Sequence, residues 1–153
     1  MRNPNVFSYS TGDEQVFFSS GLTTCDASSP PFPNGTVVVF DRVFSNVGFD
    51  YHQLTGVFTC RVPGYYKFDL HMTNINNHEA ALAITHNDQY VVDAFVQNST
   101  KVEEASNSVI IPLLQGDTVK VTSLIEESYI FSTAEFTQTT FSGQLISATI
   151  TEN

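Results

Sequence analysis

One stretch in the middle of the chain constrains the fold most, because apolar and polar side chains alternate along it on both sides of a proline-glycine pair. The alternation runs from Val57 to Val62 and resumes after Pro63-Gly64 from Tyr65 to His71. A period of two is typical of strands with one buried face, and the Pro-Gly pair indicates a sharp turn between them. The residues that we expect to face inward are Phe58, Cys60, Val62, Tyr66, Phe68 and Leu70.

The rest of the chain repeats this pattern of short strands separated by turn residues. The run Val37-Val38-Val39-Phe40 predicts a strand over 36–44, followed by a turn over 45–50. Further strands are expected at 14–22, 65–75, 80–86, 90–96, 106–114, 118–125 and 140–150. No stretch has the period of an amphipathic helix, so we expect an all-β sandwich or jelly roll. Residues 1–13 are expected to form an N-terminal arm, and residues 14–153 one globular domain.

The charge of the chain excludes some classes of partner. Six Lys and Arg residues stand against sixteen Asp and Glu, which gives a formal net charge of -10. Binding to a phosphate backbone or an anionic membrane needs clustered cations, and the sequence has none. No apolar run reaches the roughly 20 residues that a membrane-spanning helix requires, so we expect no membrane insertion. An acidic surface suits calcium, or it keeps a secreted domain soluble.

Two sequons and two cysteines bear on the compartment. Asn34-Gly35-Thr36 and Asn98-Ser99-Thr100 both lie among turn residues, where N-linked glycosylation is tolerated, and they favour a secreted glycoprotein. Cys25 and Cys60 form either one disulfide or two buried thiols, and the sequence leaves both alternatives open.

The sequence contains no recognisable catalytic motif. There is no Gly-x-Ser-x-Gly elbow, no His-Glu-x-x-His and no phosphate-binding loop, so we do not expect an enzyme. The four histidines, His52, His71, His78 and His86, lack the spacing of metal ligands and are expected to be solvated. Asp117 is expected to stabilise its turn by accepting backbone N–H bonds. Tyr65, Tyr90 and Tyr129 are either packed against the sheets or exposed for stacking on a sugar or a partner.

A set of aromatic and glycine positions resembles a known family signature. Seven positions agree at the family spacing, namely Phe40, Asn46, Tyr51, Phe58, Gly64, Tyr66 and Phe68, while Leu70 stands where the signature has an aromatic residue. Further patterns follow in order at Thr55–Phe58, Ala105–Val109, Leu114–Val119 and Phe141–Leu145. On these residues the chain resembles the globular domain of complement component C1q, which shares its fold with the tumour-necrosis-factor cytokines.

The resemblance implies a jelly-roll sandwich of about ten strands and a tight trimer, with the termini at its base and variable loops at its apex. Nothing in the sequence repeats Gly-x-y, so we expect either a protein of the globular head alone or one whose collagen stalk lies outside this sequence. Members of the family often bind calcium near the trimer axis. The matching residues here are Glu103 and Glu104, with Asp93 upstream, and carboxylate oxygens are suitable calcium ligands.

These features together predict a secreted homotrimer that acts as a lectin-like recognition module of innate immunity and binds microbial glycans. A secreted signalling or adhesion ligand for a protein receptor is the first alternative. A structural protein of the extracellular matrix is the second. The loops 97–104 and 126–138 are the expected places for a binding site.

Overall fold

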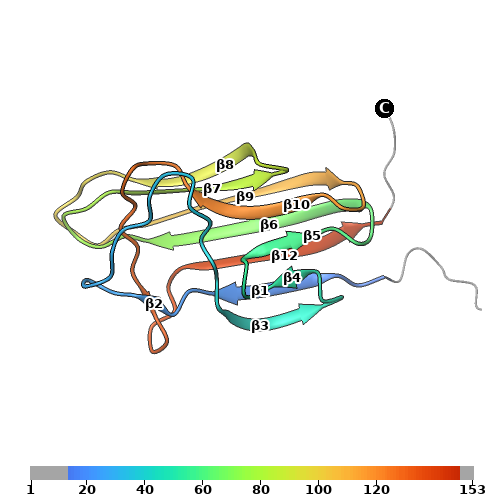
Figure 1. Ribbon diagram of the computed structural model, residues 1–153, viewed down its shortest axis with the longest axis horizontal. Coiled ribbons are helices and arrows are strands. Elements are labelled where there is room, and N and C mark those ends of the chain that lie inside the picture. Colours follow the sequence, from blue (N-terminus) through green and yellow to red (C-terminus); the bar gives the residue numbers. More distant parts are fainter. Residues whose placement is uncertain (1–13, 149–153) are drawn as a thin grey trace, which may run out of the picture.

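The computed structural model describes residues 14–148, which form a sandwich of two five-stranded β-sheets with a small two-stranded sheet at one end (Figure 1). The expected arm, residues 1–13, and the last residues of the final expected strand lie outside the described residues. The strands are β1 (Phe17–Gly21), β2 (Thr24–Cys25), β3 (Arg42–Val47), β4 (Tyr51–His52), β5 (Val57–Thr59), β6 (Gly64–Thr73), β7 (Ala80–His86), β8 (Gln89–Val96), β9 (Glu104–Leu113), β10 (Thr118–Ser123), β11 (Ser132–Thr133) and β12 (Thr140–Ser147).

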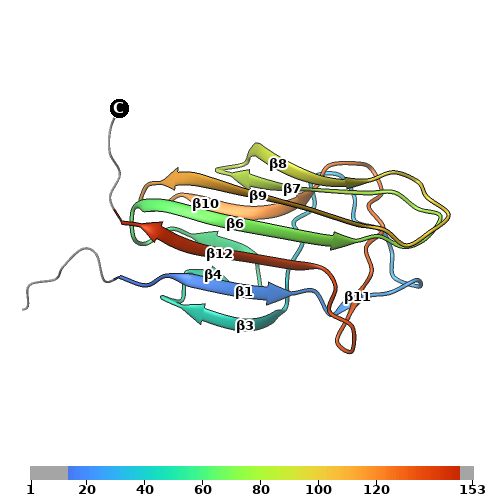
Figure 2. The ribbon, with the colours of Figure 1, turned by 180° about the vertical axis from the view of Figure 1, so that it is seen from behind.

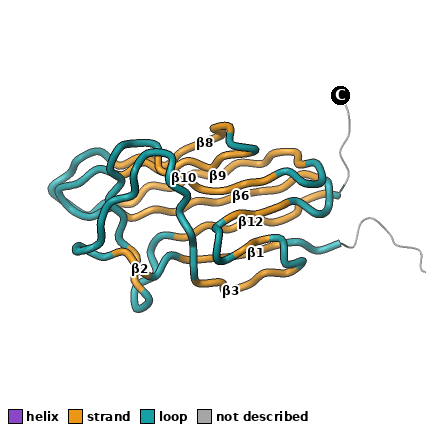
Figure 3. Tube along the Cα trace, viewed as in Figure 1, coloured by secondary structure: helices purple, strands orange, loops and turns teal. Residues whose placement is uncertain are grey.

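The first sheet has the strand order β3-β1-β12-β6-β9, and the second has the order β4-β5-β10-β7-β8. Figure 2 shows β3, β1, β12, β6 and β9 side by side on the near face. Neighbouring strands pair antiparallel throughout, and the longest ladder joins β6 to β9 from Gly64–Leu113 to Thr73–Glu104. Only strands and loops occur among the described residues (Figure 3). The expected all-β sandwich is therefore confirmed.

The strand expected over 36–44 and the turn expected over 45–50 are both misplaced. β3 covers Arg42–Val47, so only residues 42–44 of the expected strand belong to it, and the turn begins at Gly48. Val38 donates its N–H to Val121 of β10 in the second sheet at 2.9 Å. A few residues later, Arg42–Val47 pair with β1 in the first sheet. The segment therefore crosses from one sheet to the other, which a single straight strand cannot do.

The aromatic residues of the signature lie in the core between the sheets. Tyr51, Phe58, Tyr66, Phe68 and Leu70 are each at most 3% exposed, so the inward face expected for the Val57–Leu70 stretch is confirmed for these positions. The ring of Phe18 stacks on Tyr51 at 4.6 Å between centroids and lies 5.5 Å from Phe58. Aromatic pairs at such distances add about 0.5–1.5 kcal/mol beyond the area that they bury.

Polar groups of the same signature fix the backbone around this core. The Tyr51 hydroxyl donates to the carbonyl oxygen of Phe40 at 2.8 Å. The Asn46 amide donates to the Tyr51 carbonyl at 2.8 Å and accepts the Tyr51 N–H at 3.3 Å. Asn46 thereby closes the turn between β3 and β4, in which Gly48 and Phe49 both have positive φ. The signature is thus a set of packing and turn requirements rather than a binding motif.

The two cysteines are free and buried, so the disulfide alternative is not formed in the structure. Cys25 pairs with Ser132 in the small sheet, at the end of the sandwich that carries β2 (Figure 1). Cys60 lies just before the corner between β5 and β6, at the other end, and its thiol donates to the Val62 carbonyl at 3.1 Å. Burial raises the pKa of both thiols, to about 11 for Cys25, which keeps them protonated and unreactive.

Candidate functional site

Three loops meet at the end of the sandwich where β6 ends, opposite the end where β1 begins and β12 stops (Figures 1 and 2). We call residues 74–79, 97–103 and 124–131 the distal loops. The loop 74–79 lies between the other two and is bonded to both. Asn77 donates its N–H to the Ser99 carbonyl at 2.6 Å, and Ile75 donates to the Tyr129 carbonyl at 3.2 Å. The two regions where the sequence predicts a binding site are thus brought together through a third.

Asn74 is the residue that holds this arrangement. It is fully buried, and its amide oxygen accepts the Glu103 N–H at 2.7 Å while its amide nitrogen donates to the His78 carbonyl at 2.7 Å. Its own backbone N–H donates to the Glu103 carbonyl at 3.1 Å. Sequence reasoning missed Asn74, because it lies at the end of the expected strand from 65 to 75. The only signal was a polar residue that breaks the apolar alternation of that strand.

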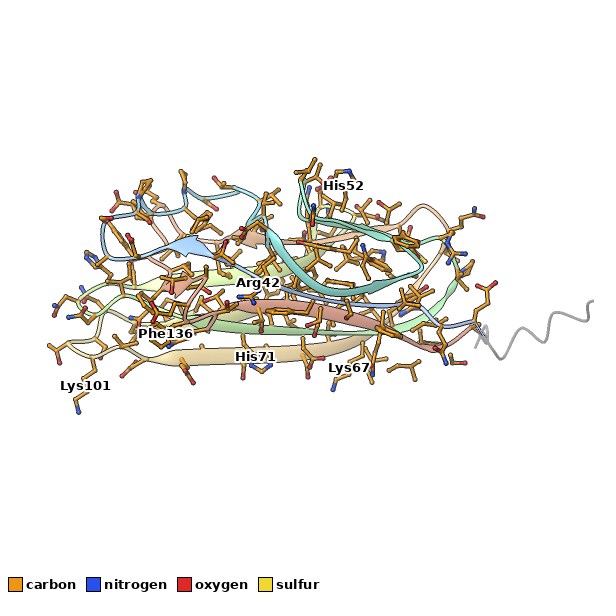
Figure 4. The ribbon with its side chains drawn as sticks, turned by 90° about the horizontal axis from the view of Figure 1, so that it is seen from below. Arg42, His52, Lys67, His71, Lys101 and Phe136 are labelled. Carbon is orange, nitrogen blue, oxygen red and sulfur yellow. The ribbon has the colours of Figure 1, made fainter. Side chains whose placement is uncertain are left out.

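The charged side chains exposed on the distal loops are mostly acidic. Glu79, Glu103, Glu126 and Glu127 are exposed there, and Lys101 is the one cation among the residues of the distal loops. In Figure 4 Lys101 projects from this end. Val102 adds an apolar side chain that is 55% exposed. His78 stacks on Tyr129 at 3.8 Å between ring centroids, so one face of each ring is covered by the other.

The residues expected to bind calcium are not assembled into a site by one chain. The Asp93 carboxylate accepts the Tyr90 hydroxyl at 2.5 Å on β8, and the Glu103 carboxylate accepts the Ser99 hydroxyl at 3.1 Å. Glu104 is exposed at the start of β9. Residues 14–148 contain no group of three His, Cys, Asp or Glu side chains placed to hold a metal ion. A site shared between three chains stays a prediction.

A second candidate surface is the outer face of the β3-β1-β12-β6-β9 sheet, which we call the sheet face. The register places one row of side chains across all five strands, and its members are Val47, Phe17, Gln144, Lys67 and Ile110. The next row toward the distal loops is Ser45, Ser19, Ser142, Asp69 and Ser108. Lys67 and His71 project outward from this face in Figure 4, whereas His52 projects on the opposite side.

Exposed apolar side chains flank the polar centre of the sheet face. Val47 is 40% exposed, Phe17 37% and Ile110 57%. Between them the Lys67 ammonium lies 3.5 Å from the Asp69 carboxylate. Over the serine row the face is hollowed by about 240 Å³, with Phe17, Asp69 and Gln144 at the rim. The sequence showed the alternation along each strand but not this row, because strand order and register are not visible in it.

Two of the predicted histidines are exposed, while a third is hydrogen-bonded to Asp117. His52 and His71 are exposed as expected, but His86 is hydrogen-bonded through its Nε2 to the Asp117 carboxylate at 2.9 Å. Asp117 also accepts the Leu114 N–H at 2.9 Å, which confirms its expected role in the turn. Burial opposes ionisation of Asp117, but the hydrogen bonds from Asn87, Leu114 and His86 outweigh it and lower its pKa. Tyr90 is 59% exposed, and its bond to Asp93 raises its pKa.

Both sequon asparagines, Asn34 and Asn98, are exposed and lie in loops. No helix among the described residues is long and apolar enough to cross a membrane.

Comparison with known proteins gives a consistent result. A family model of the C1q domain matches residues 18–146. The chain is 37% identical to mouse complement C1q tumor necrosis factor-related protein 6 over 86% of this chain and 49% of that protein. It is 36% identical to human complement C1q tumor necrosis factor-related protein 2 over 72% of this chain and 39% of that protein. The chain therefore spans about half or less of the length of these relatives.

Solved structures show the same fold at lower identity. The globular domain of zebrafish complement 1qA protein matches with a TM-score of 0.68 and 22% identity, over 87% of this chain and 98% of that chain. The Eiger TNF of S. frugiperda matches with a TM-score of 0.68 and 9% identity, over 90% of this chain and 98% of that chain. Murine APRIL matches with a TM-score of 0.67 and 9% identity, over 87% of this chain and 100% of that chain.

Proposed function

This chain belongs to the C1q domain family, and from that premise we propose that it is a secreted, trimeric recognition module that binds microbial glycans or similar patterned surfaces through its distal loops. The fold is the jelly roll of C1q and tumour-necrosis-factor domains. Binding rather than catalysis is proposed, and the partner is recognised at the surface of the assembled head.

The observation that carries the trimeric assembly in this proposal is the sheet face. Val47 and Phe17 lie side by side on one row and Ile110 lies at its other end, and apolar side chains gathered on one face favour a surface that a partner covers. The edge strand β8 exposes further aromatic side chains, Tyr90 at 59% and Phe95 at 46%. A face and a separate edge that cover each other make a heterologous contact, which closes into a ring when the rotation between copies permits it and otherwise gives an open filament. A trimer that buries both surfaces is the simplest closed assembly for this family.

Trimerisation would allow the distal loops of three copies to bind one patterned surface together. Three copies arranged about one axis point their distal loops in the same direction, so that weak single contacts combine into avidity. The acidic side chains Glu103 and Glu104 of three copies would repel one another unless a cation lies between them. Calcium, which takes carboxylate oxygens, is the cation that we propose for this position.

A glycan array with and without calcium tests the recognition step, and light scattering on the same protein tests the trimer. Calcium-dependent binding to microbial sugars by a trimeric sample is the expected result. If a sample shown to be trimeric bound none of the glycans on the array, the proposed lectin-like function would be wrong. The matched variant Glu103→Gln keeps the side-chain length and removes the charge, and it should abolish the calcium dependence.

A signalling or adhesion ligand for a protein receptor is the second candidate. The curated relatives are named as tumor necrosis factor-related proteins, and the solved neighbours include the tumour-necrosis-factor proteins APRIL and Eiger. Capture of a single cell-surface protein by the trimer, without any response on the glycan array, would favour this candidate over the first.

A further inference from the structure

Asn34 lies at the corner of a tight turn whose backbone is held on both sides. Thr36 donates its N–H to the Pro33 carbonyl at 3.1 Å, which closes the turn, and Gly35 between them has a φ of 79°. Gly35 also donates its N–H to the Ser123 carbonyl at 2.8 Å, at the end of β10. Asn34 itself is exposed, and within residues 14–148 no hydrogen bond engages its side-chain amide. The turn is therefore fixed while its asparagine side chain stays free.

The turn borders a hollow of about 420 Å³, with Asn34 on its rim. Leu124 and Ile125 supply half-buried apolar side chains, and Glu79, Glu126 and Glu127 supply carboxylates. Carboxylates accept hydrogen bonds from hydroxyl and amide groups, and apolar side chains pack against the C–H face of a sugar ring. The hollow thus has the chemistry that a covalently attached acetamido sugar needs.

We propose that Asn34 carries an N-linked glycan and that the first sugar of this glycan occupies the hollow bordered by Asn34, Leu124 and Glu126. This inference rests on the proposed secretion of the chain, because the modification takes place in the secretory pathway. The sequon Asn34-Gly35-Thr36 supplies the acceptor. Beside Asn34 the structure also supplies a hollow that can hold the first sugar.

The transfer step is balanced without any change of oxidation state. The side-chain nitrogen of Asn34 attacks C1 of the first sugar of an oligosaccharide that is linked to a lipid pyrophosphate. The new C–N bond forms as the C–O bond to the pyrophosphate breaks, the lipid pyrophosphate leaves with the bonding electron pair, and the amide nitrogen loses one proton. The reaction takes place on the extended chain, and the exposed turn then accommodates the product on folding.

The position of Asn34 leaves the proposed trimer surface free. Its turn is bonded to β10, in the middle of the β4-β5-β10-β7-β8 sheet and separated from the edge strand β8 by β7, whereas the sheet face belongs to the other sheet. A glycan at Asn34 would therefore shield Leu124 and Ile125 without blocking assembly. It would also fill the acidic hollow on that side, so that ligands reach the distal loops from the side of loop 97–103.

Expression of the chain in a eukaryotic secretory host tests the proposal, with the wild type compared with Thr36→Ala and Thr36→Ser. Peptide mapping should find a glycan on Asn34 in the wild type and in Thr36→Ser, which keeps the sequon, and none in Thr36→Ala. An unmodified Asn34 in secreted wild-type protein would overturn the proposal. Light scattering on the same samples reports the trimer separately, so failure of the glycan and failure of the proposed function are distinguishable.

Hydrogen exchange tests whether the first sugar of the glycan lies in the hollow. The amides of residues 124–127 should exchange severalfold more slowly in glycosylated wild type and Thr36→Ser than in Thr36→Ala. In the variant Thr100→Ala, which removes only the sequon at Asn98, the amides of residues 124–127 should exchange at the wild-type rate. A modified Asn34 with equal exchange rates in all four proteins would show that the sugar stands away from the hollow and would contradict that part of the proposal.

Discussion

Gly64 is fixed by the backbone that surrounds it rather than by its own conformation. A Cβ at this position would lie 2.3 Å from the Ser147 carbonyl oxygen and 3.0 Å from the Cα of Ala148. The chain after β12 therefore passes directly over Gly64, at the corner between β5 and β6. This close approach explains why the glycine belongs to the signature together with the aromatic positions, which the sequence alone could relate to it only through spacing.

Gly64→Ala is expected to lower the free energy of unfolding by at least about 3 kcal/mol, because backbone cannot rotate away from the added methyl group as a side chain can. The matched variant Gly116→Ala has a positive φ of 91° but nothing within 4 Å of the added Cβ. Only backbone strain of about 1 kcal/mol is expected there. Urea titration of both variants measures the difference, and equal losses would contradict the steric explanation.

Asp117 should make the stability of the domain depend on pH. Because its pKa is lowered below 3.8 in the folded state, the charged carboxylate stabilises the fold above about pH 4. This contribution is lost as the pH falls from about 4 through the lower folded pKa. Asp117→Asn should cost about 1–2 kcal/mol at pH 7, since it removes the charge from the bonds with His86 and Leu114.

The difference between Asp117→Asn and the wild type should shrink as the pH is lowered from 7 to 3. Asp88→Asn is the control, because Asp88 is an exposed carboxylate that pairs with Lys120 at 2.6 Å at the surface. Surface pairs contribute about 0–1 kcal/mol. A cost for Asp117→Asn that stays constant from pH 7 to pH 3 would mean that the carboxylate charge is not its cause.

At the scale of elements, the strands with clear alternation were predictable and the segments that change partners were not. The expected strand 65–75 corresponds to β6 and the expected 80–86 to β7, because a buried face imposes period two on the sequence. The segment 36–47 contains buried Val38 and Phe40, yet it leaves one sheet and joins the other. Which sheet a strand joins depends on contacts far along the chain, and these leave no local pattern.

The same limit applies to the candidate sites. Loops 97–104 and 126–138 could be chosen from their composition, but the bridge between them through Asn74 depends on the fold. The rows of the sheet face also require the strand order and register. The sequence therefore predicts which segments carry the surfaces, and only the structure places Phe17 and Ile110 on one row.

Asn46→Ala tests how the β3–β4 connection is held. The variant removes both bonds between the Asn46 side chain and the Tyr51 backbone, next to a turn in which Phe49 has a φ of 59°. A loss of about 2 kcal/mol is expected, because the Tyr51 N–H and carbonyl lose their partners. Ser45→Ala, one residue earlier, should change the stability by no more than about 0.5 kcal/mol. Thermal unfolding of the two variants provides the comparison, and a similar loss in both would contradict the role of Asn46.

At the scale of the whole molecule, the proposed trimer places the sheet face of each copy against an edge of its neighbour. The centre of that contact would be polar, with Lys67 and Asp69 paired at 3.5 Å, and the apolar residues would lie on either side of it. A buried pair of this kind adds little affinity, because removing both charges from water costs about as much as their attraction returns. The affinity must then come from side chains such as Phe17 and Ile110.

Ile110→Lys should convert the trimer to a monomer without unfolding it. The new ammonium would stand directly opposite Lys67 in the register of β6 and β9, so that two like charges would be buried together on assembly. A loss of about 3 kcal/mol per contact, on the order of 100-fold in affinity, is expected for a charge at such a position. Leu54→Lys is the matched control, because Leu54 is 78% exposed on the turn between β4 and β5, in the other sheet. Light scattering should give a monomer for Ile110→Lys and a trimer for Leu54→Lys, with native circular dichroism for both. A trimer that survives Ile110→Lys but dissociates with Leu54→Lys would place the contact on the opposite sheet.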